Sequence, residues 1–318
     1  MNIVCATDDN FVQHCCIMLT SVLINNTNVN VYLLTEGLLE RNIEILKNEV
    51  ENKKGKFHII VVDSAIIGKF PMPNSKILSH ISQATYYRLL ISDILPSDLK
   101  KVIYLDCDII VRKSLDELWS YDISGFSIGA VHQIGLEIED ANRLKYPVEY
   151  GYFNAGVLLI NMDYWRKNKV SEQLFRYLVN NFEKIRFHDQ DALNAVLHDS
   201  CFTLPCKWNM LGFFFDKDVF KTIGFHNGIL INDFSEYKSM ILEEIKDPTL
   251  IHYVFKPKPW QSVCLHPYRN EYFKYAELSL NYSKILKPNK LLNFVYFIYI
   301  QFITILIKLK HLVFIKVK

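Results

Sequence analysis

The feature that most constrains the fold is the apolar run VIYLDCDIIV at residues 102–111, which contains two aspartates. Val, Ile, Tyr and Leu favour packed, pleated positions, so the run predicts a buried strand. Burying an ionised carboxylate is costly unless it is paired. In an extended chain, residues two apart face the same side, so Asp106 and Asp108 can converge on one cation. Two interpretations stay open: a divalent metal, or a strand end with solvated acids or salt bridges to Lys101 or Arg112.

Composition and charge narrow the class of protein. The chain has 318 residues, of which 50% are hydrophobic, and Lys+Arg 36 nearly balance Asp+Glu 34. This length and composition predict a globular protein with one large α/β domain or a domain with an appendage. A net charge of +2 argues against a nucleic-acid partner, which would require a strongly basic face.

The seven cysteines include no Cys-X-X-Cys pair, and Cys5 and Cys107 fall in predicted core strands. Buried free thiols in a reducing compartment fit this pattern better than a disulfide framework or a zinc site. The first residues contain no signal-peptide pattern. We therefore expect a cytoplasmic protein.

Strand-like and helix-like segments alternate along the chain, which predicts an α/β fold with a mostly parallel, doubly wound sheet. A helix is expected to begin near Phe11, capped by Asp9 or Asn10. Ligands in such sheets bind at the carboxyl ends of strands, where residues 7–10 and 106–108 fall. We expect strands at 2–6, 31–34, 57–62, 102–111, 127–131 and 156–160, and further helices at 38–50, 83–94, 163–182 and 189–197.

The C-terminal tail differs from the rest of the chain. Residues 291–307 read LLNFVYFIYIQFITILI between lysine-rich flanks, and their few polar side chains fall within a narrow helical arc. This pattern predicts an amphipathic helix, and we expect residues 284–318 to bind an anionic membrane surface. Lying on the surface is favoured over spanning the bilayer, and the alternative is a helix packed on the core or on a second copy. We expect residues 1–275 to form the main domain and residues 276–318 the membrane-associating tail.

Several motifs in order resemble one family. They are ATDDN at 6–10, TYYRL at 85–89, YLDCD at 104–108, FNAGVLLIN at 153–161, HDQDALN at 188–194, LPCKWN at 204–209 and HYVFKPKPW at 252–260. Their order and spacing resemble the retaining glycosyltransferases of family 8, in particular bacterial lipopolysaccharide galactosyl- and glucosyltransferases. The resemblance covers residues 1–275.

The resemblance implies a GT-A fold, a Rossmann-like architecture that uses a nucleotide sugar. The implied reaction moves a hexose from UDP-galactose or UDP-glucose to a hydroxyl of a lipopolysaccharide or another glycan or glycolipid acceptor. Asp106, Asp108 and His252 would hold Mn²⁺, with Mg²⁺ as the alternative ion. Two carboxylates and an imidazole suit Mn²⁺ better than Mg²⁺, which prefers oxygen ligands. A metal bridging the phosphates would stabilise the leaving UDP without a proton donor.

The resemblance also assigns residues around the nucleotide. Lys258 would contact the diphosphate, and Arg88 would lie near the diphosphate and the donor sugar. Ala6, Asp8 and Asn10 would hold the uridine and the ribose. From the residues alone, a solvated lysine is the favoured interpretation of Lys258. The alternative for Arg88 is a salt bridge on an exposed helix face, and Asn10 is equally a helix cap.

Around the donor sugar, the resemblance assigns Asn154, Asp189 and Gln190, whose amides and carboxylate suit hydroxyl recognition. Asp189 and Gln190 are the expected catalytic residues, although Asp189 also suits a helix N-cap. Because an amide is a poor nucleophile, we expect a same-face displacement rather than a covalent glycosyl-enzyme.

The chain departs from the family pattern at two points. Phe255 replaces the glycine of the His-Tyr-X-Gly-X-X-Lys-Pro-Trp motif, which affects the approach of the backbone to the diphosphate. After Ala130 the chain has Val131, His132 and Gln133 where close relatives carry an aspartate, so the identity of the sugar stays open. Two other functions stay open: a phosphohydrolase with an aspartate nucleophile, and a non-catalytic nucleotide-sugar-binding protein.

Overall fold

The computed structural model describes residues 1–71, 83–133, 137–215, 225–226, 229–230, 235–254, 256–285, 295 and 298. Phe255 and nearly all of the tail expected at 284–318 lie outside the described residues. Within the described part of the chain, no helix combines the length and the apolar character needed to cross a bilayer.

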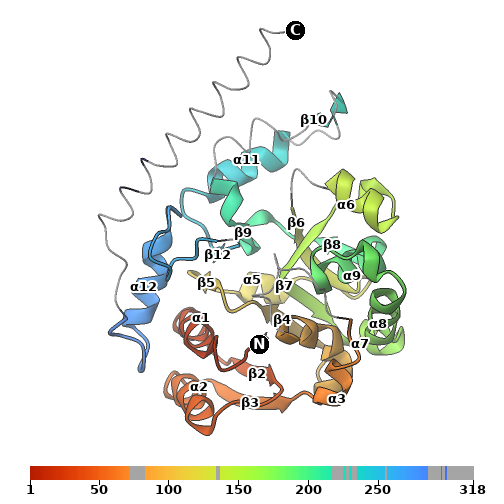
Figure 1. The fold of residues 1–318 in the computed structure, drawn as a ribbon. Coiled ribbons are helices and arrows are strands. Elements are labelled where there is room, and N and C mark those ends of the chain that lie inside the picture. The colour runs from red at the N-terminus through yellow and green to blue at the C-terminus, as the bar shows by residue number, and fades with distance from the viewer. Residues whose placement is uncertain are drawn as a thin grey trace.

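A seven-stranded sheet forms the centre of the molecule (Figure 1). Its strands are parallel except β7, which runs antiparallel to both of its neighbours. The predicted mostly parallel sheet is therefore confirmed. In spatial order the strands are β3 (Lys56–Val61), β2 (Asn30–Thr35), β1 (Asn2–Ala6), β4 (Lys101–Leu105), β7 (Phe153–Asn161), β6 (Ile128–His132) and β8 (Cys201–Thr203).

Side chains alternate between two hydrophobic cores, one on each face of this sheet. In β4, Ile103 and Leu105 join one core, whereas Val102 and Tyr104 join the other. This alternation follows from the two-residue period of a strand buried on both faces. The first core is covered by α1 (Val12–Asn25), α2 (Glu40–Asn52), α5 (Asp116–Ser120) and α11 (Ser235–Glu244). The second is covered by α3 (Ser64–Ile67), η1 (Gln83–Leu90), α4 (Ile91–Ile94), α7 (Met162–Lys167), α8 (Val170–Asn180) and α9 (His188–Leu197). Figure 1 shows α1 and α2 on the side of the strands opposite α7, α8 and α9.

A second, three-stranded sheet carries part of the site. The run at 102–111 is not one strand: β4 ends at Leu105, residues 106–108 turn, and β5 (Ile109–Val111) enters the second sheet. There β5 pairs antiparallel with β12 (Leu250–His252), which pairs parallel with β9 (Met210–Leu211). The single-strand prediction was wrong because a turn leaves both carboxylates partly accessible, whereas a continuous buried strand would desolvate them fully.

Other boundaries also differ from the sequence prediction. The helix expected at 163–182 is two helices, α7 and α8, separated where Lys169 adopts φ 51°. No apolar side chain lies between Trp165 and Val170, so no core contact favours continuing the helix there. The segment expected as one helix at 83–94 is the 3₁₀ helix η1 followed by α4.

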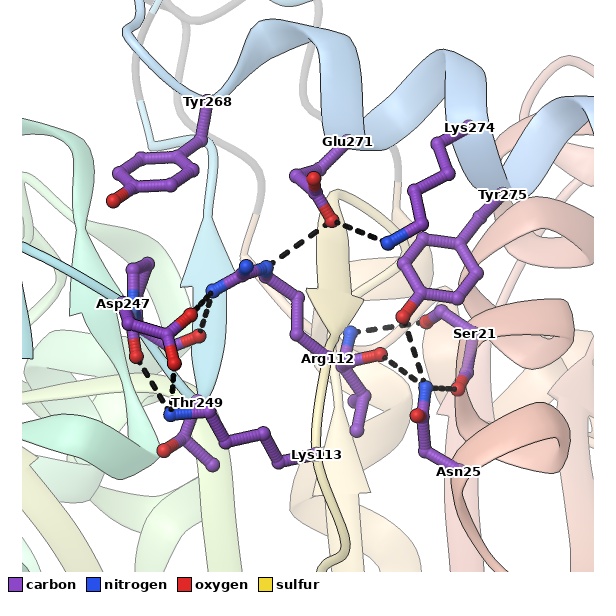
Figure 2. Close-up of polar contacts among 12 residues, drawn as sticks. Ser21, Asn25, Arg112, Lys113, Asp247, Thr249, Tyr268, Glu271, Lys274 and Tyr275 are labelled. Carbon is purple, nitrogen blue, oxygen red and sulfur yellow. Dashed lines mark hydrogen bonds and ion pairs between the residues drawn. The ribbon is translucent and has the colours of Figure 1, made fainter.

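Arg112, at the far end of β5, fixes the second sheet to the rest of the molecule (Figure 2). Its guanidinium pairs with Asp247 at 2.8 Å and with Glu271 of α12 (Arg269–Glu277) at 3.1 Å. Its backbone N–H donates to the carbonyl of Thr249 at 2.9 Å. From α1, Asn25 donates to the carbonyl of Val111 at 3.0 Å. These contacts fix the end of the β5–β12 pair opposite the two aspartates.

The described fold also includes α6 (Glu137–Leu144), η2 (Val148–Tyr150) and the pair of β10 (Phe225–His226) with β11 (Ile229–Leu230). Short 3₁₀ turns link other elements: η3 (Phe182–Lys184), η4 (His198–Ser200), η5 (Cys206–Trp208) and η6 (Gly212–Phe215). All seven cysteines are free, and all but Cys201 are buried.

Candidate active site

Asp106 and Asp108 of the β4–β5 turn converge with His252, the last residue of β12. One potential ligand atom from each lies within 4.8 Å of the other two. Nε2 of His252 is 3.2 Å from a carboxylate oxygen of Asp108 and 3.9 Å from one of Asp106. The second sheet makes this possible because β12 aligns His252 opposite Ile109, next to Asp108. Residues about 145 positions apart in sequence are thereby brought to one point.

Hydrogen bonds orient the His252 ring for metal binding. The backbone N–H of Gly156 donates to Oδ1 of Asn154, which identifies that atom as the acceptor for Nδ2 of Asn209 at 2.9 Å. Oδ1 of Asn209 therefore faces Nδ1 of His252 at 2.9 Å and accepts its proton. Nε2 of His252 is therefore the ring nitrogen available to an ion, and it lies toward the two carboxylates. Partners of this kind typically set the tautomer of histidine ligands.

Gly156 of β7 leaves room for these ligands. A Cβ at this position would lie 2.2 Å from Cε1 of His252 and 3.0 Å from Oδ2 of Asp106. Only a residue without a side chain fits between the two ligands. The three side chains thus fit a divalent ion such as Mn²⁺ in donor chemistry, ring tautomer and available space.

Lys258 lies beside Asp108, with 2.6 Å between Nζ and Oδ2, and Nζ also donates to the carbonyl of Tyr253. Burial would raise the pKa of Asp108, but Lys258 and His252 outweigh it and hold that pKa well below its usual range. Lys258 is mostly buried, so it is not the solvated lysine that its sequence context also allowed.

Arg88 of η1 links the metal ligands to the predicted sugar-binding residues. It is 6% exposed, which excludes the exposed salt bridge considered from the sequence. Nη2 lies 2.8 Å from Asp106, Nε lies 2.9 Å from Asp189, and Nη1 donates to the carbonyl of Ala155 at 2.6 Å. Burial alone would lower the pKa of Arg88, but Asp106 and Asp189 raise it, so the guanidinium stays charged.

Asp189 is a buried carboxylate with both oxygens engaged. Oδ1 accepts the hydroxyl proton of Thr85, and Oδ2 pairs with Arg88. Burial raises the pKa of Asp189 to about 6, although Arg88 and Thr85 oppose that increase. The cap of α9 is Phe187, so the N-cap interpretation of Asp189 was wrong.

Asn154 and Gln190 lie in contact between β7 and α9. Oε1 of Gln190 accepts from Nδ2 of Asn154 and from the backbone N–H of Ala155, both at 3.0 Å. Asn154 also binds Asn209, so hydrogen bonds run from His252 through Asn209 and Asn154 to Gln190. Asn209 therefore connects both residues to the metal-ligand side of the site through hydrogen bonds.

The sequence of this chain is similar to those of known glycosyltransferases. A model of the family described as Glycosyl transferase family 8 matches residues 2–264. The chain belongs to this family. General stress protein A of Bacillus subtilis (strain 168) is 30% identical over 290 residues, which cover 89% of this chain and 94% of that protein. Lipopolysaccharide 1,2-glucosyltransferase of Escherichia coli is 26% identical over 299 residues, covering 91% and 83% of the two chains.

Among solved structures, galactosyltransferase LgtC in complex with donor and acceptor sugar analogues is similar, with a TM-score of 0.76 and 25% identity. The match covers 88% of this chain and 97% of LgtC. The fold of this family 8 glycosyltransferase is therefore GT-A, as the resemblance implied.

The end of β1 and the turn after it contribute Ala6, Asp8 and Asn10 at the edge of the sheet that also carries the aspartates. Ala6 accepts a hydrogen bond from the Cys107 thiol at 3.2 Å. Oδ1 of Asp8 accepts from the backbone N–H groups of Asn10 and Phe11, so Asp8 closes the turn before α1. The predicted cap at Asp9 or Asn10 was wrong. Asp9 instead accepts from the backbone of Leu39 at the start of α2.

The prediction missed several residues near the site. Asn209 ends the LPCKWN motif but has no signal that marks it as the orienting partner of His252. Phe11, 39% exposed, lies beside Asp8 and packs edge-on against His14 and Trp260. His14 stacks on Trp260 with ring centroids 3.8 Å apart. An aromatic residue with helical spacing is more often part of a core, so these were not distinguishable from sequence.

Asp106 and Asp108 are partly buried and are paired with cations from other elements. The side chains of Asp106 and Asp108 are 25% and 16% exposed, so neither is a solvated strand end. Their cationic neighbours are Arg88 and Lys258, not Lys101 or Arg112. Lys101 donates to the carbonyl of Trp119, and Arg112 belongs to the junction in Figure 2.

Proposed function

We propose that this family 8 enzyme is a metal-dependent, retaining hexosyltransferase. It transfers galactose or glucose from its UDP-sugar to a hydroxyl of a lipopolysaccharide or another glycan or glycolipid acceptor. The observation that carries the proposal is the continuity of the site: Arg88 contacts both Asp106 and Asp189, so the metal ligands and the sugar-side residues form one connected cluster. A donor with a diphosphate at one end and a sugar at the other matches that arrangement.

On the nucleotide side, Asp106, Asp108 and His252 would hold Mn²⁺, with Mg²⁺ as the alternative. When bound, the ion supplies positive charge that stabilises the diphosphate leaving group. Lys258 adds a point charge beside it, and its hydrogen bonds to Asp108 and Tyr253 aim Nζ at this region. Ala6, Asp8 and Asn10 would receive the uridine and ribose.

On the sugar side, Asp189 and Asn154 orient hydroxyl groups, and Arg88 keeps Asp189 paired. At neutral pH, Asp189 is mainly ionised, because its pKa of about 6 lies below 7. Its Oδ1 accepts from Thr85 and its Oδ2 forms an ion pair with Arg88, which lowers its competence as a nucleophile. Gln190 carries an amide, which is a poor nucleophile. These properties support same-face displacement, in which the acceptor hydroxyl attacks as UDP leaves.

The remaining parts of the proposal concern organisation. Residues 1–275 form the catalytic domain, and residues 276–318 form a tail whose basic, apolar segment binds an anionic membrane. This places the enzyme at the inner face of the cell membrane, where an amphiphilic acceptor is reached. The free cysteines are compatible with that compartment.

The test incubates the enzyme with a panel of UDP-sugars, Mn²⁺ and a membrane-glycan extract, and detects product by mass spectrometry. We expect product that depends on Mn²⁺ and has the anomeric configuration of the donor. Asp108→Asn should abolish transfer and retain the fold. Asp98→Asn, which changes an exposed carboxylate before the start of β4, should leave transfer unchanged. Absence of turnover with all donors would favour the binding-protein alternative, and a trapped phospho-aspartate would favour the phosphohydrolase. An adduct on Asp189 would contradict same-face displacement.

A further inference from the structure

A chain of buried polar groups leads from Arg143 of α6 to the amide of Gln190. It involves Arg143, Asp191 and Tyr152, none of which was identified as a site residue from the sequence. Because two of these side chains are ionic and one is a neutral hydroxyl, the chain has a direction. That direction determines which end of the Gln190 amide faces which partner.

The chain begins at Asp191, which is fully buried and has five hydrogen-bond donors. Arg143 binds it in a bidentate manner at 2.8 and 2.9 Å. The backbone N–H groups of Arg186 and Phe187 donate to it at 2.6 and 2.8 Å. The hydroxyl of Tyr152 donates at 2.8 Å. A carboxylate held by this many donors is an acceptor only, so each of its partners must supply the proton.

Tyr152 transmits this constraint. Its side chain is fully buried, and burial together with Asp191 raises its pKa well above its usual value, so it keeps its proton. Because that proton points to Asp191, the Tyr152 oxygen can only accept from Gln190. The group of Gln190 at 3.1 Å is therefore the NH₂ end, Nε2.

The other end of the amide fits this assignment. Oε1 of Gln190 faces two donors, the backbone N–H of Ala155 and Nδ2 of Asn154. Both lone pairs of Oε1 are thus used. Within the described part of the chain, the second Nε2–H is the polar group of this amide that has no partner.

We propose that Arg143, Asp191 and Tyr152 are positioning residues that lock the Gln190 amide, so that it offers an N–H donor and not its oxygen to the reacting sugar. The inference rests on the proposed function, because it takes Gln190 to lie at the donor sugar. Asp191 acts from beneath the site: its oxygens are saturated and it has no accessible surface, so it does not touch substrate. We call Arg143, Asp191 and Tyr152 the relay. It holds the Gln190 N–H donor in place before the same-face reaction begins, so the donor does not have to reorient during the reaction.

The test uses Tyr152→Phe, which removes the hydroxyl and keeps the ring, with Gln190→Ala and the double variant. We expect Tyr152→Phe to lower kcat by about tenfold, the scale of one lost hydrogen bond. KM for the UDP-sugar should stay within experimental error. In the Gln190→Ala background, Tyr152→Phe should cause no further loss. The matched control is Tyr275→Phe, a buried hydroxyl that accepts from Asn25 in the remote junction of Figure 2 and should leave kcat unchanged.

A second measurement reads the orientation without activity. With ¹⁵N-glutamine labelling, the side-chain signal lost in Gln190→Ala identifies Nε2. Its protons should exchange slowly with solvent in the wild type and in Tyr275→Phe, and much faster in Tyr152→Phe. Unchanged exchange in Tyr152→Phe would overturn the relay, as would equal losses of kcat from Tyr152→Phe in both backgrounds. Slow exchange in an enzyme that turns over no UDP-sugar would instead reject the proposed function and leave the relay supported.

Discussion

Gly156→Ala tests whether the site is built around a missing side chain. The new Cβ would lie 2.2 Å from Cε1 and 2.8 Å from Nδ1 of His252. Carbon atoms in contact are about 3.5–4.0 Å apart, so the imidazole must withdraw by about 1.5 Å. The strand cannot yield easily, since the Gly156 carbonyl accepts from the backbone of Asp106 and its N–H donates to Asn154.

The expected consequence is a loss of metal binding that exceeds the loss of stability. Overpacking of this kind costs about 1–3 kcal/mol, which a protein of this size can tolerate. Metal–ligand distances tolerate only about 0.2 Å, so affinity should fall by at least about 100-fold. Free Mn²⁺ is measured by electron paramagnetic resonance during a titration, with thermal unfolding measured on the same samples.

Gly125→Ala is the matched control, because no heavy atom lies within 4 Å of the position its Cβ would take. It should bind Mn²⁺ like the wild type. If Gly156→Ala also binds Mn²⁺ with wild-type affinity, then the ion does not sit between Asp106 and His252, and the geometric argument for this metal site is wrong.

Three further predictions address separate parts of the molecule. Lys258→Met removes the cation that pairs with Asp108 and competes with the metal for it. Calorimetry should therefore show tighter Mn²⁺ binding but weaker UDP binding. Weaker binding of both would contradict the competition between Lys258 and the metal. Burial lowers the pKa of His14 from 6.5 to about 4. Between these pH values the unfolded chain takes up a proton that the folded protein does not, so the stability present above pH 6.5 is lost as the pH falls toward 4. In metal-free protein, His14→Phe should therefore reduce the acid-induced loss of unfolding free energy by up to about 3 kcal/mol, and denaturant titrations with an unchanged pH slope would refute this. Deleting residues 291–318 should reduce binding to anionic vesicles and preserve UDP-sugar hydrolysis, whereas undiminished vesicle binding would reject the role of the tail.

The sheet was predictable because its strands carry local signals. Strands such as 2–6 and 156–160 are short apolar runs between helical patterns, and burial on both faces leaves that composition in the sequence. The break between Leu105 and Ile109 left no such mark, because the run stays apolar on both sides of the aspartates. Its cause is non-local: β5 pairs with β12, which comes about 140 residues later in the chain.

The candidate site also contains residues that the sequence marks and residues that it does not. Asp106 and Asp108 were recognisable because paired acids in an apolar run require compensation. Arg88, Lys258 and His252 were named through the family resemblance, since an isolated Arg, Lys or His carries no such signal. Asn209, Tyr152 and Asp191 contribute through the orientation of hydrogen bonds, which depends on atoms fixed only in the folded chain. Sequence reasoning therefore finds charges more readily than the neutral groups that orient them.

The buried charge at Arg88 allows a last prediction, in which metal and stability are linked. Arg88→Met leaves Asp106 and Asp189 without their shared cation in a site where Arg88 is 6% exposed. Breaking a buried ion pair costs about 3–5 kcal/mol, which lowers the melting temperature by about 10 °C in a domain of this size.

A saturating divalent metal should restore part of that loss, because it neutralises Asp106 but not Asp189. The metal-induced rise in melting temperature should thus be larger in Arg88→Met than in the wild type. Arg176→Met, which breaks an exposed pair with Glu172, is the control and should change stability by less than about 1 kcal/mol with no metal dependence. If metal raises the melting temperature of Arg88→Met no more than that of the wild type, then Arg88 and the metal do not share Asp106. The connection between the metal and the sugar-side carboxylate, on which the proposed reaction depends, would then be lost.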